Sequence, residues 1–150
     1  MPDFEAYAAN LADPTQTRFL AGPSDRRAAW RTFAAQTGTW FLNGGGWWAV
    51  EKRDDGAVVG TVGAFFRETA ETVVELGWML YPAYWARGFA TEAAKAALQY
   101  ALDTHGARPI VAHIAPDNVA SIAVSKHLGM TYEAEVDFYG APICRYMITR

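Results

Sequence analysis

The sequence predicts one domain, residues 1–150, with a mixed α/β (α+β) fold in which helices flank a mostly antiparallel sheet. Three observations lead to this prediction. Apolar residues recur at helical spacing up to about residue 42, three apolar runs joined by short polar turns follow between residues 47 and 80, and helical and strand-like patterns then alternate to the end. With 51% apolar residues, 150 residues are enough to bury one core.

Two helices are predicted in the first part of the chain. Asp3–Ala12 and Ser24–Leu42 both carry apolar residues at helical spacing, and Asp3 and Ser24 are suited to be their N-caps. The run Asn43–Gly46 ends the second helix, because glycine readily adopts the left-handed backbone that other residues resist.

Three strands follow these helices. The runs Trp47–Lys52, Ala57–Phe66 and Thr72–Leu80 are rich in aromatic and β-branched residues. An Asp-Gly turn at 53–56 joins the first two strands, and a polar turn at 67–71 joins the second to the third. Strands connected by such short turns form an antiparallel meander.

The last third of the chain alternates between helices and strands. Ala90–Leu102 and Asn118–Leu128 have helical periodicity, and Arg108–Ile114 between them is a short strand rich in Val and Ile. Thr131–Phe138 and Ile143–Ile148 form a final hairpin. The predicted sheet is therefore mixed and covered by helices.

Composition excludes several classes of function. The 13 basic and 16 acidic residues give a net charge of −3, and no basic run exceeds Arg26-Arg27, which argues against a nucleic-acid partner. Cys144 is the only cysteine, and no two histidines have helical metal-ligand spacing, so neither a disulfide framework nor a metal site is expected. The sequence has no membrane-spanning apolar run and no signal-peptide profile. We expect a cytoplasmic protein without membrane or nucleic-acid partners.

An anion site is predicted at the junction Leu80–Glu92, where a strand ends and a helix begins. The backbone N–H groups of a helix start converge at the positive end of its dipole. Gly88 and Ala90 leave room for a phosphate to approach the backbone, and Arg87 adds a positive charge. The same residues are also compatible with an ordinary connection between a strand and a helix.

A second polar cluster is predicted on the following helix. Asn118, Ser121, Ser125 and Leu128 follow one another at spacings of three, four and three residues, so they share one face. Asn118 alone is typical of an N-cap, and a serine in an alanine-rich helix is typical of a packing residue. A functional role is favoured because this helix follows the strand next to the predicted anion site.

Two motifs in these regions are specific when they occur together. The first is ELGWMLYP at 75–82 followed by GFATEA at 88–93, and the second is PDNVAS at 116–121 followed by KHLGM at 126–130. With these motifs the sequence resembles the GNAT superfamily of acetyl-CoA-dependent N-acetyltransferases. It resembles most the branch that includes the RimJ and RimL ribosomal-protein N-terminal acetyltransferases.

The resemblance covers nearly the whole chain in element order, and it implies a GNAT-like fold. In that fold the strand Thr72–Leu80 splays from the next strand, Arg108–Ile114, and opens a cleft for coenzyme A. Family members normally begin with a strand before the first helix, whereas this chain opens almost directly in the helix at Asp3, so we expect either a truncated start or the loss of an edge strand.

The resemblance implies acetyl-CoA as co-substrate and no metal. The backbone at the strand end would hydrogen-bond the pantetheine arm, one amide there would polarise the thioester carbonyl, and the loop and helix start would hold the pyrophosphate. Asn118 would orient the pantetheine amides. Trp85 stands where the family usually has a polar residue, so its side chain is expected to make no polar contact. The implied coenzyme-binding residues are Trp78, Met79, Leu80, Trp85, Ala86, Arg87, Gly88, Phe89, Ala90, Thr91, Asn118 and Lys126.

The resemblance also implies direct attack of an amine on the thioester within a ternary complex. Ser121 is the candidate that donates a proton to the departing thiolate. Ser125 is the second candidate, because it replaces a general-acid tyrosine that many members have seven residues after the motif asparagine. Glu75 is the candidate that removes the proton of the amine through water. Glu75 is equally well explained as a solvated carboxylate on a strand.

The function that follows is acetyl transfer from acetyl-CoA to a primary amine, either a protein N-terminus or a small amine. Two alternatives come from other classes of function: a non-catalytic acyl-CoA-binding or sensor domain, and a protein interaction module. The sheet edge left unpaired by the absent first strand is compatible with a homodimer.

The 6 Trp, 7 Tyr and 8 Phe are many rings for one core. We assign five of them to the core by their spacing, and ten to the walls of the cleft. The core group is Trp30, Phe33, Phe41, Phe65 and Phe66. The coenzyme side is assigned Trp78, Tyr81, Tyr84, Trp85 and Phe89, and the acceptor side Trp40, Trp47, Trp48, Phe138 and Tyr139.

Overall fold

The computed structural model describes residues 2–67, 73–106 and 108–148, and it has the predicted order of elements with two short additions, α2 and η1. The helices are α1 (Pro2–Leu11), α2 (Pro14–Thr17), α3 (Arg26–Asn43), α4 (Phe89–His105) and α5 (Val119–His127), with a 3-10 turn η1 (Pro82–Tyr84). The strands are β1 (Gly46–Glu51), β2 (Val58–Phe65), β3 (Val74–Leu80), β4 (Ile110–Ile114), β5 (Thr131–Phe138) and β6 (Ala141–Ile148). Thr72, the predicted start of the third strand, lies outside the described residues.

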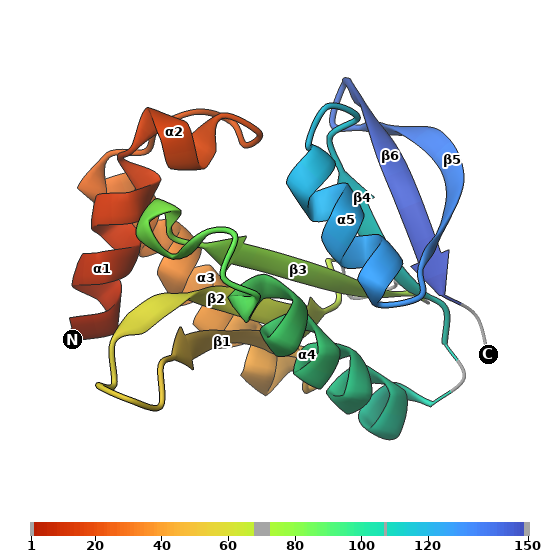
Figure 1. Ribbon diagram of the computed structural model, residues 1–150, viewed down its shortest axis with the longest axis horizontal. Helices are drawn as coiled ribbons and strands as arrows, with labels where there is room; N and C mark the ends of the chain where they lie inside the picture. The colour runs from red at the N-terminus through yellow and green to blue at the C-terminus, as the bar shows by residue number, and fades with distance from the viewer. Residues whose placement is uncertain (1, 68–72, 107, 149–150) are drawn as a thin grey trace.

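The described strands form one sheet in the order β1-β2-β3-β4-β6-β5. Only β3 and β4 are parallel, and the other neighbours are antiparallel. The register of β3 and β4 contains just two pairs, Val74 with Ile110 and Glu75 with Val111, and the two strands then diverge (Figure 1). The predicted mixed fold is confirmed, and the predicted splay is present.

Helices cover both faces of the sheet. The main core lies between the sheet and helices α4 and α5, where Leu76 of β3 packs with Ala97 of α4 and Leu128 after α5. A smaller cluster, which includes Tyr7, joins α1 to α3 on the opposite face. In Figure 1, α4 lies in front of β1–β3, α1 and α3 lie behind them, and α5 accompanies β4 and β6. None of the described helices is long and apolar enough to cross a bilayer.

The starts of the first two predicted helices differ from the prediction. The first helix begins at Pro2, so Asp3 lies in its first turn rather than at its N-cap. The N-cap of α3 is Asp25, whose Oδ1 accepts from the backbone N–H of Ala28 at 2.7 Å. Ser24 is held one residue earlier, because its backbone N–H donates to the carbonyl of Leu11. At the other end of α3, Gly44 has the expected left-handed conformation.

The aromatic residues assigned to the core divide differently in space. Trp30 and Phe41 are 46% and 90% exposed, so their assignment to the core was wrong. Trp40 occupies the position on α3 that contacts Trp48, with ring centroids 4.6 Å apart. Consecutive residues of a helix point about 100° apart, so Phe41 is turned toward solvent.

Two glycines in neighbouring strands accommodate one tryptophan ring. Trp47 of β1 lies across Gly63 of β2 and Gly77 of β3, and it stacks on Phe65. A Cβ atom on Gly77 would lie 2.5 Å from Cη2 of Trp47, and one on Gly63 would lie 2.8 Å from Cδ2. Both strands therefore need glycine at these positions because the ring fills the space of a side chain.

Candidate active site

A cleft of about 470 Å³ lies where β3 ends and α4 and α5 begin. The α2 segment closes it from the opposite side. Eleven of the twelve predicted coenzyme-binding residues line it, namely Trp78, Met79, Leu80, Trp85, Ala86, Arg87, Gly88, Phe89, Ala90, Thr91 and Asn118. Ser121, the first candidate proton donor, lines it as well.

The loop into α4 exposes backbone N–H groups to this cleft. Ala86 and Gly88 have φ angles of 55° and 85°, and the first intrahelical bond runs from the N–H of Glu92 to the carbonyl of Gly88. The N–H groups of the first helical turn, at 89–91, therefore have no carbonyl partner within the helix. Ala86 pays a steric penalty of about 1–2 kcal/mol for its left-handed backbone, which points to a functional constraint on the loop.

Gly88 has a positive φ of 85°, which disfavours other residues. A Cβ atom built on it meets no protein atom within 4 Å, so the space in front of its backbone is open. That glycine leaves this space to a phosphate stays a prediction. The groups that an anion would contact are the amides that this backbone conformation exposes.

Positive charge reaches the cleft from two arginines. Arg87 lies over the rings of Tyr84 and Phe89, with its guanidinium carbon 5.8 and 5.6 Å from their centroids. Arg18 lies over Phe19 at 4.5 Å. Among the described residues that line the cleft there is no carboxylate. The charge balance of the cleft favours an anionic ligand.

Arg18 and the rest of the α2 segment were missed by the sequence analysis. A helix of four residues is too short to show periodicity. The available signal was the pair Asp13-Pro14, since Asp13 caps the helix by accepting from the N–H of Thr15 at 2.7 Å and Pro14 occupies the first helical position.

The backbone of β3 presents alternate residues to the gap beside β4. The N–H of Tyr81 donates to the carbonyl of Val59 in β2, so odd-numbered residues of β3 pair with β2 and even-numbered ones point the other way. Trp78 and Leu80 therefore face the gap with their backbone, while Met79 reaches the cleft with its side chain.

Trp85 makes a polar contact that the sequence analysis did not expect. Its indole N–H donates to the carbonyl of Leu80 at 2.5 Å. This bond ties the loop to the end of β3 and occupies one of the backbone acceptors that were assigned to the pantetheine arm. The N–H of Leu80 and both backbone groups of Trp78 are the remaining backbone groups of this face.

Ser121 is connected to β3 across the splay. Its Oγ accepts from the indole N–H of Trp78 at 3.3 Å, and its backbone N–H donates to Oδ1 of Asn118 at 3.2 Å. Asn118 is thus the N-cap of α5, which is the structural role that the sequence predicted for it, and it also lines the cleft. Within the described part of the chain the hydroxyl proton of Ser121 is donated to no residue, so it is available to a ligand.

Two predicted site residues of α5 lie away from the cleft. Ser125 is fully buried, and its hydroxyl donates to the carbonyl of Ile122 at 2.9 Å, which leaves no proton for a substrate. Lys126 is exposed in the last turn of α5 and does not line the cleft. The spacing placed Ser121 and Ser125 on one helix face, but successive turns of that face point first into the cleft and then into the core.

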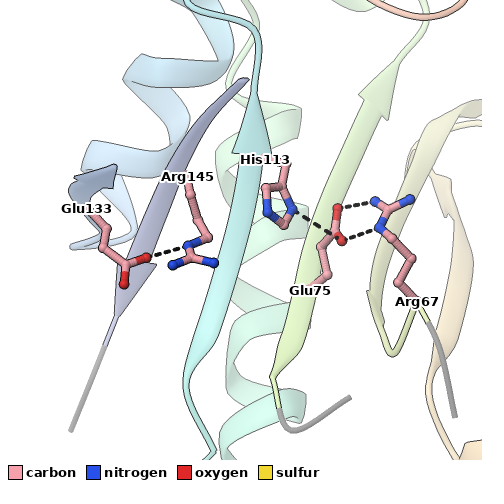
Figure 2. Close-up of polar contacts among 5 residues, drawn as sticks. All are labelled: Arg67, Glu75, His113, Glu133 and Arg145. Carbon is pink, nitrogen blue, oxygen red and sulfur yellow. Dashed lines mark hydrogen bonds and ion pairs between the residues drawn. The ribbon is translucent and has the colours of Figure 1, made fainter. Parts of the chain in front are cut away.

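Glu75 lies outside the cleft, between two basic side chains (Figure 2). Arg67 donates to both of its carboxylate oxygens, with Nε 2.7 Å from Oε2, and Nδ1 of His113 lies 3.4 Å from Oε2. Glu75 is only 6% exposed, so its interpretation as a solvated carboxylate was wrong. Burial acts to raise the pKa of Glu75, but His113 and Arg67 together outweigh burial and lower it. A carboxylate so held binds a proton weakly, which argues against Glu75 as the base.

The charged row continues across the sheet beyond His113. Nε of Arg145 on β6 lies 2.5 Å from Oε2 of Glu133 on β5, and Arg145 is the register partner of His113 (Figure 2). Each of the two carboxylates in the row is therefore paired with an arginine. Within the row Arg67 neutralises the buried charge of Glu75, which is a structural contribution, whereas the pair of Glu133 and Arg145 is partly exposed.

The aromatic residues assigned to the cleft are only partly there. Tyr84 lines the cleft together with the coenzyme-side rings already named, but Tyr81 does not. On the acceptor side, Phe138 packs against His113, with ring centroids 4.8 Å apart. Trp40 and Trp48 contact Tyr100 of α4, and Trp47 and Trp48 line a second, smaller cavity.

Comparison with known proteins identifies the family of this chain. Residues 2–131 match the model of the acetyltransferase (GNAT) domain. The uncharacterized protein YkkB of Bacillus subtilis is 30% identical over 146 residues, which are 97% of this chain and 78% of the relative. The crystal structure of an acetyltransferase from Agrobacterium tumefaciens superposes with a TM-score of 0.88 at 28% identity, covering 100% of this chain and 86% of that one.

A spermidine N-acetyltransferase from Vibrio cholerae, solved in complex with CoA and spermine, has the same fold. Its TM-score is 0.80 at 15% identity, and the match covers 99% of this chain and 90% of that one. From the domain match and the relatives together, the chain belongs to the GNAT family of acetyltransferases.

Proposed function

We propose that residues 1–150 form one N-acetyltransferase domain that moves an acetyl group from acetyl-CoA to a primary amine by direct attack in a ternary complex. The observation that carries this proposal is the cleft at the start of α4. It combines unpaired helix-start amides, a strained loop and two arginines with no lining carboxylate among the described residues. Members of this family use acetyl-CoA, and the cleft has the charge and the backbone donors that its phosphates require.

The cleft residues fit the parts of acetyl-CoA in sequence along the chain. The amides at 89–91 and the guanidinium of Arg87 would hold the pyrophosphate, and Arg18 would add charge from the opposite wall. The backbone of Trp78 and the N–H of Leu80 would pair with the pantetheine arm, with Asn118 beside them. A backbone N–H aimed at the thioester oxygen would stabilise the negative charge that develops there.

In the chemical step the attacking amine loses one proton to water and the departing sulfur gains one from Ser121, which regains its proton from solvent. The lone pair of the amine attacks the thioester carbon, a C–N bond forms, and the C–S bond breaks with its electrons on sulfur. Ser121 is the donor that we propose for this thiolate, because its oxygen already accepts from Trp78 and its own proton is uncommitted among the described residues. The acceptor is a small amine or a protein N-terminus. The small amine has support from the CoA and spermine complex of the same fold.

Two further parts of the proposal rest on sequence. We place the protein in the cytoplasm, because a chain with a single cysteine is compatible with a reducing compartment. A homodimer through a sheet edge is the assembly that an unpaired strand would favour.

The test of the proposed function compares Gly88→Asp with Gly88→Asn. Both side chains tolerate a positive φ and have nearly the same shape, but only the aspartate places a negative charge at the helix-start amides. We expect the affinity for acetyl-CoA, measured by calorimetry, to fall at least about tenfold more in Gly88→Asp than in Gly88→Asn, since one opposed phosphate contact is worth about 1–2 kcal/mol. Equal affinities in the two variants would contradict the anion site.

Turnover separates an enzyme from a binding domain. Release of the CoA thiol with a panel of primary amines is expected for the wild type. Ser121→Ala should lower kcat by at least about tenfold and leave acetyl-CoA affinity unchanged, whereas Ser125→Ala, whose hydroxyl bonds inside α5, should keep kcat. Acetyl-CoA binding without thiol release for any amine would instead support the non-catalytic acyl-CoA-binding domain.

A further inference from the structure

A second cavity, of about 190 Å³, lies on the sheet face opposite α4, under α1 and α3. We call it the α1–β3 cavity. The residues of its lining that matter here are Asp3 and Tyr7 of α1, Phe33 of α3, Trp47 of β1, Thr61 of β2 and Tyr81 after β3.

Two hydroxyl groups in the lining of this cavity have no hydrogen-bond partner among the residues that the structure describes. Oγ1 of Thr61 and the phenolic oxygen of Tyr81 make no hydrogen bond to any described residue. Thr61 is only 8% exposed and Tyr81 only 3%. Buried hydroxyls are nearly always hydrogen-bonded, because leaving one unpaired costs free energy. The cavity is therefore built to receive a polar group.

The electrostatics of the cavity select the charge of that group. Asp3 is the one charged residue among its described lining residues, and no Lys or Arg lines it. Burial raises the pKa of Tyr81 to about 12, and the charge of Tyr7 in its ionised form and the charge of Asp3 add to this effect. Burial likewise raises the pKa of Tyr7 to about 12, although a hydrogen bond with Gln36 opposes it. Both phenols are neutral at physiological pH, so the carboxylate of Asp3 is the charge in the described lining, and it disfavours an anion and favours a cation.

The aromatic walls of the cavity favour an organic cation over a hydrated metal ion. Three aromatic rings line the cavity, those of Tyr7, Phe33 and Trp47. The faces of aromatic rings attract organic cations, which hold their water shell weakly. A hydrated metal ion gains less, since no group of three or more metal-ligating side chains occurs among the described residues. An ammonium group on a short apolar body satisfies the carboxylate, the hydroxyls and the rings together.

The α1–β3 cavity is adjacent to the coenzyme cleft. Met79 lines the cleft, and its register partner in β2 is Thr61, which lines the cavity. Tyr81 follows Met79 by two residues on the same strand face, about 7 Å further along. The side of β3 that bears Met79 thus separates a site for the acetyl donor from a site for a cation.

We propose that the α1–β3 cavity binds an organic ammonium group, and that this group belongs to the amine acceptor. A protonated nitrogen has no lone pair with which to attack a thioester. The bound ammonium is therefore a second charge that the acceptor carries besides its reacting amine, and the cavity makes the protein selective for such acceptors. The assignment to the acceptor rests on the proposed acetyl transfer, whereas the binding of an ammonium group does not.

The direct test titrates the full chain, without acetyl-CoA, with n-butylammonium chloride and with n-butanol, its neutral counterpart of similar size. Chemical shifts of the backbone amides locate the site. We expect saturable binding of butylammonium at Thr61 and Tyr81, about fivefold tighter than butanol because of the cation–aromatic and carboxylate contacts. Asp3→Asn should abolish this preference for the cation. Tyr81→Phe, which removes one hydroxyl acceptor and no charge, should weaken butylammonium binding but keep the preference for butylammonium over butanol.

Glu5→Gln is the matched control for Asp3→Asn. Glu5 lies in the same first turn of α1, but its carboxylate pairs with Arg26 and does not line the cavity. Its loss removes the same charge from the same helix end. If Glu5→Gln abolishes the preference as fully as Asp3→Asn, or if butylammonium binds no better than butanol, the cation site is overturned.

The acceptor assignment has a separate readout. Among amines of equal length that support thiol release, those with a second cationic group should have the lower KM, and Asp3→Asn should raise that KM without changing the KM for acetyl-CoA. Equal KM values for singly and doubly charged amines would overturn the assignment while leaving the binding site. Absence of thiol release with every amine would overturn the acetyl transfer, and the butylammonium titration would still decide the cavity.

Discussion

Glu75 shows how the surroundings of a residue in the fold can argue against the role that its sequence motif suggested. Its place in the ELGWMLYP motif suggested a base, but the fold surrounds its carboxylate with Arg67 and His113 and removes it from solvent. Those partners are 8 and 38 positions away in the chain, so no local pattern could reveal them. In the structure Glu75 is the buried anion that connects β3 to Arg67, two residues after β2, and to His113 of β4 (Figure 2).

Replacing Glu75 with glutamine should therefore change the dependence of stability on pH. Because the folded-state pKa of Glu75 lies below its ordinary value of 4.5, the carboxylate stabilises the fold above that pH. This contribution is lost as pH falls through the lowered pKa. At pH 7 we expect Glu75→Gln to lower the free energy of unfolding by about 1–3 kcal/mol, and to flatten its fall below pH 4.5 by up to about 1.4 kcal/mol per pH unit.

Urea unfolding between pH 3 and 8 measures this effect. Glu133→Gln is the control, because Glu133 pairs with Arg145 in the same charged row but is about one-third exposed, so its loss should cost less than about 1 kcal/mol. Parallel pH profiles for the wild type and Glu75→Gln would show that the Glu75 carboxylate is not stabilised by its partners.

At the scale of elements, the packing of Trp47 explains why β2 and β3 contain glycines that sequence reasoning left unexplained. The ring lies flat over Gly63 and Gly77 and connects three strands on the face that bears the α1–β3 cavity. Glycine in a strand interior normally weakens it, since it adds backbone entropy and no packing surface. Here the tryptophan from β1 supplies the missing packing surface.

Gly77→Ala should consequently destabilise the protein by about 1–3 kcal/mol, the usual cost of overfilling a packed site. The added methyl would lie 2.5 Å from the ring of Trp47, and adding Trp47→Leu in the same chain should recover part of the loss. Gly38→Ala in α3 is the control, because its methyl meets nothing within 4 Å and alanine favours helix, so stability should stay equal or rise. Thermal unfolding of the wild type, Gly77→Ala, Trp47→Leu and the double variant measures the coupling, and additive effects of the Gly77 and Trp47 changes would contradict direct contact.

At the scale of the whole molecule, the sequence predicted those features that are formed by residues consecutive in the chain. The long helices and all strands were recognised from periodicity, and the bounds predicted for Thr131–Phe138 are those of β5. The cleft lining was predicted well because the end of β3, the loop and the start of α4 are consecutive in the chain. The α1–β3 cavity was not predicted, since it forms only when α1, α3 and three strands pack together, and its Thr61 carries no local signal.

The two halves of the sheet should respond together when acetyl-CoA binds. The described β3 and β4 share only two register pairs, so the cleft between them is bordered by Trp78 on one half and by Asn118 and Ser121 on the other. A ligand that contacts both sides adds a connection that the sheet lacks. At 100 times its Kd, acetyl-CoA should raise the free energy of unfolding by about 2.7 kcal/mol, which for a chain of this length is a rise in Tm of roughly 5–10 °C.

Amide hydrogen exchange can locate this connection. We expect acetyl-CoA to slow exchange at the start of α4 and at the start of α5, although the two segments lie about 30 residues apart in the chain. In Gly88→Asp, whose anion site is blocked, both effects should disappear at the same acetyl-CoA concentration. Butylammonium should leave α5 unchanged, because its proposed site borders β3 from the other face. Protection confined to α4 would show that the coenzyme rests on one half of the sheet only, and that Ser121 is too far away to serve the thiolate.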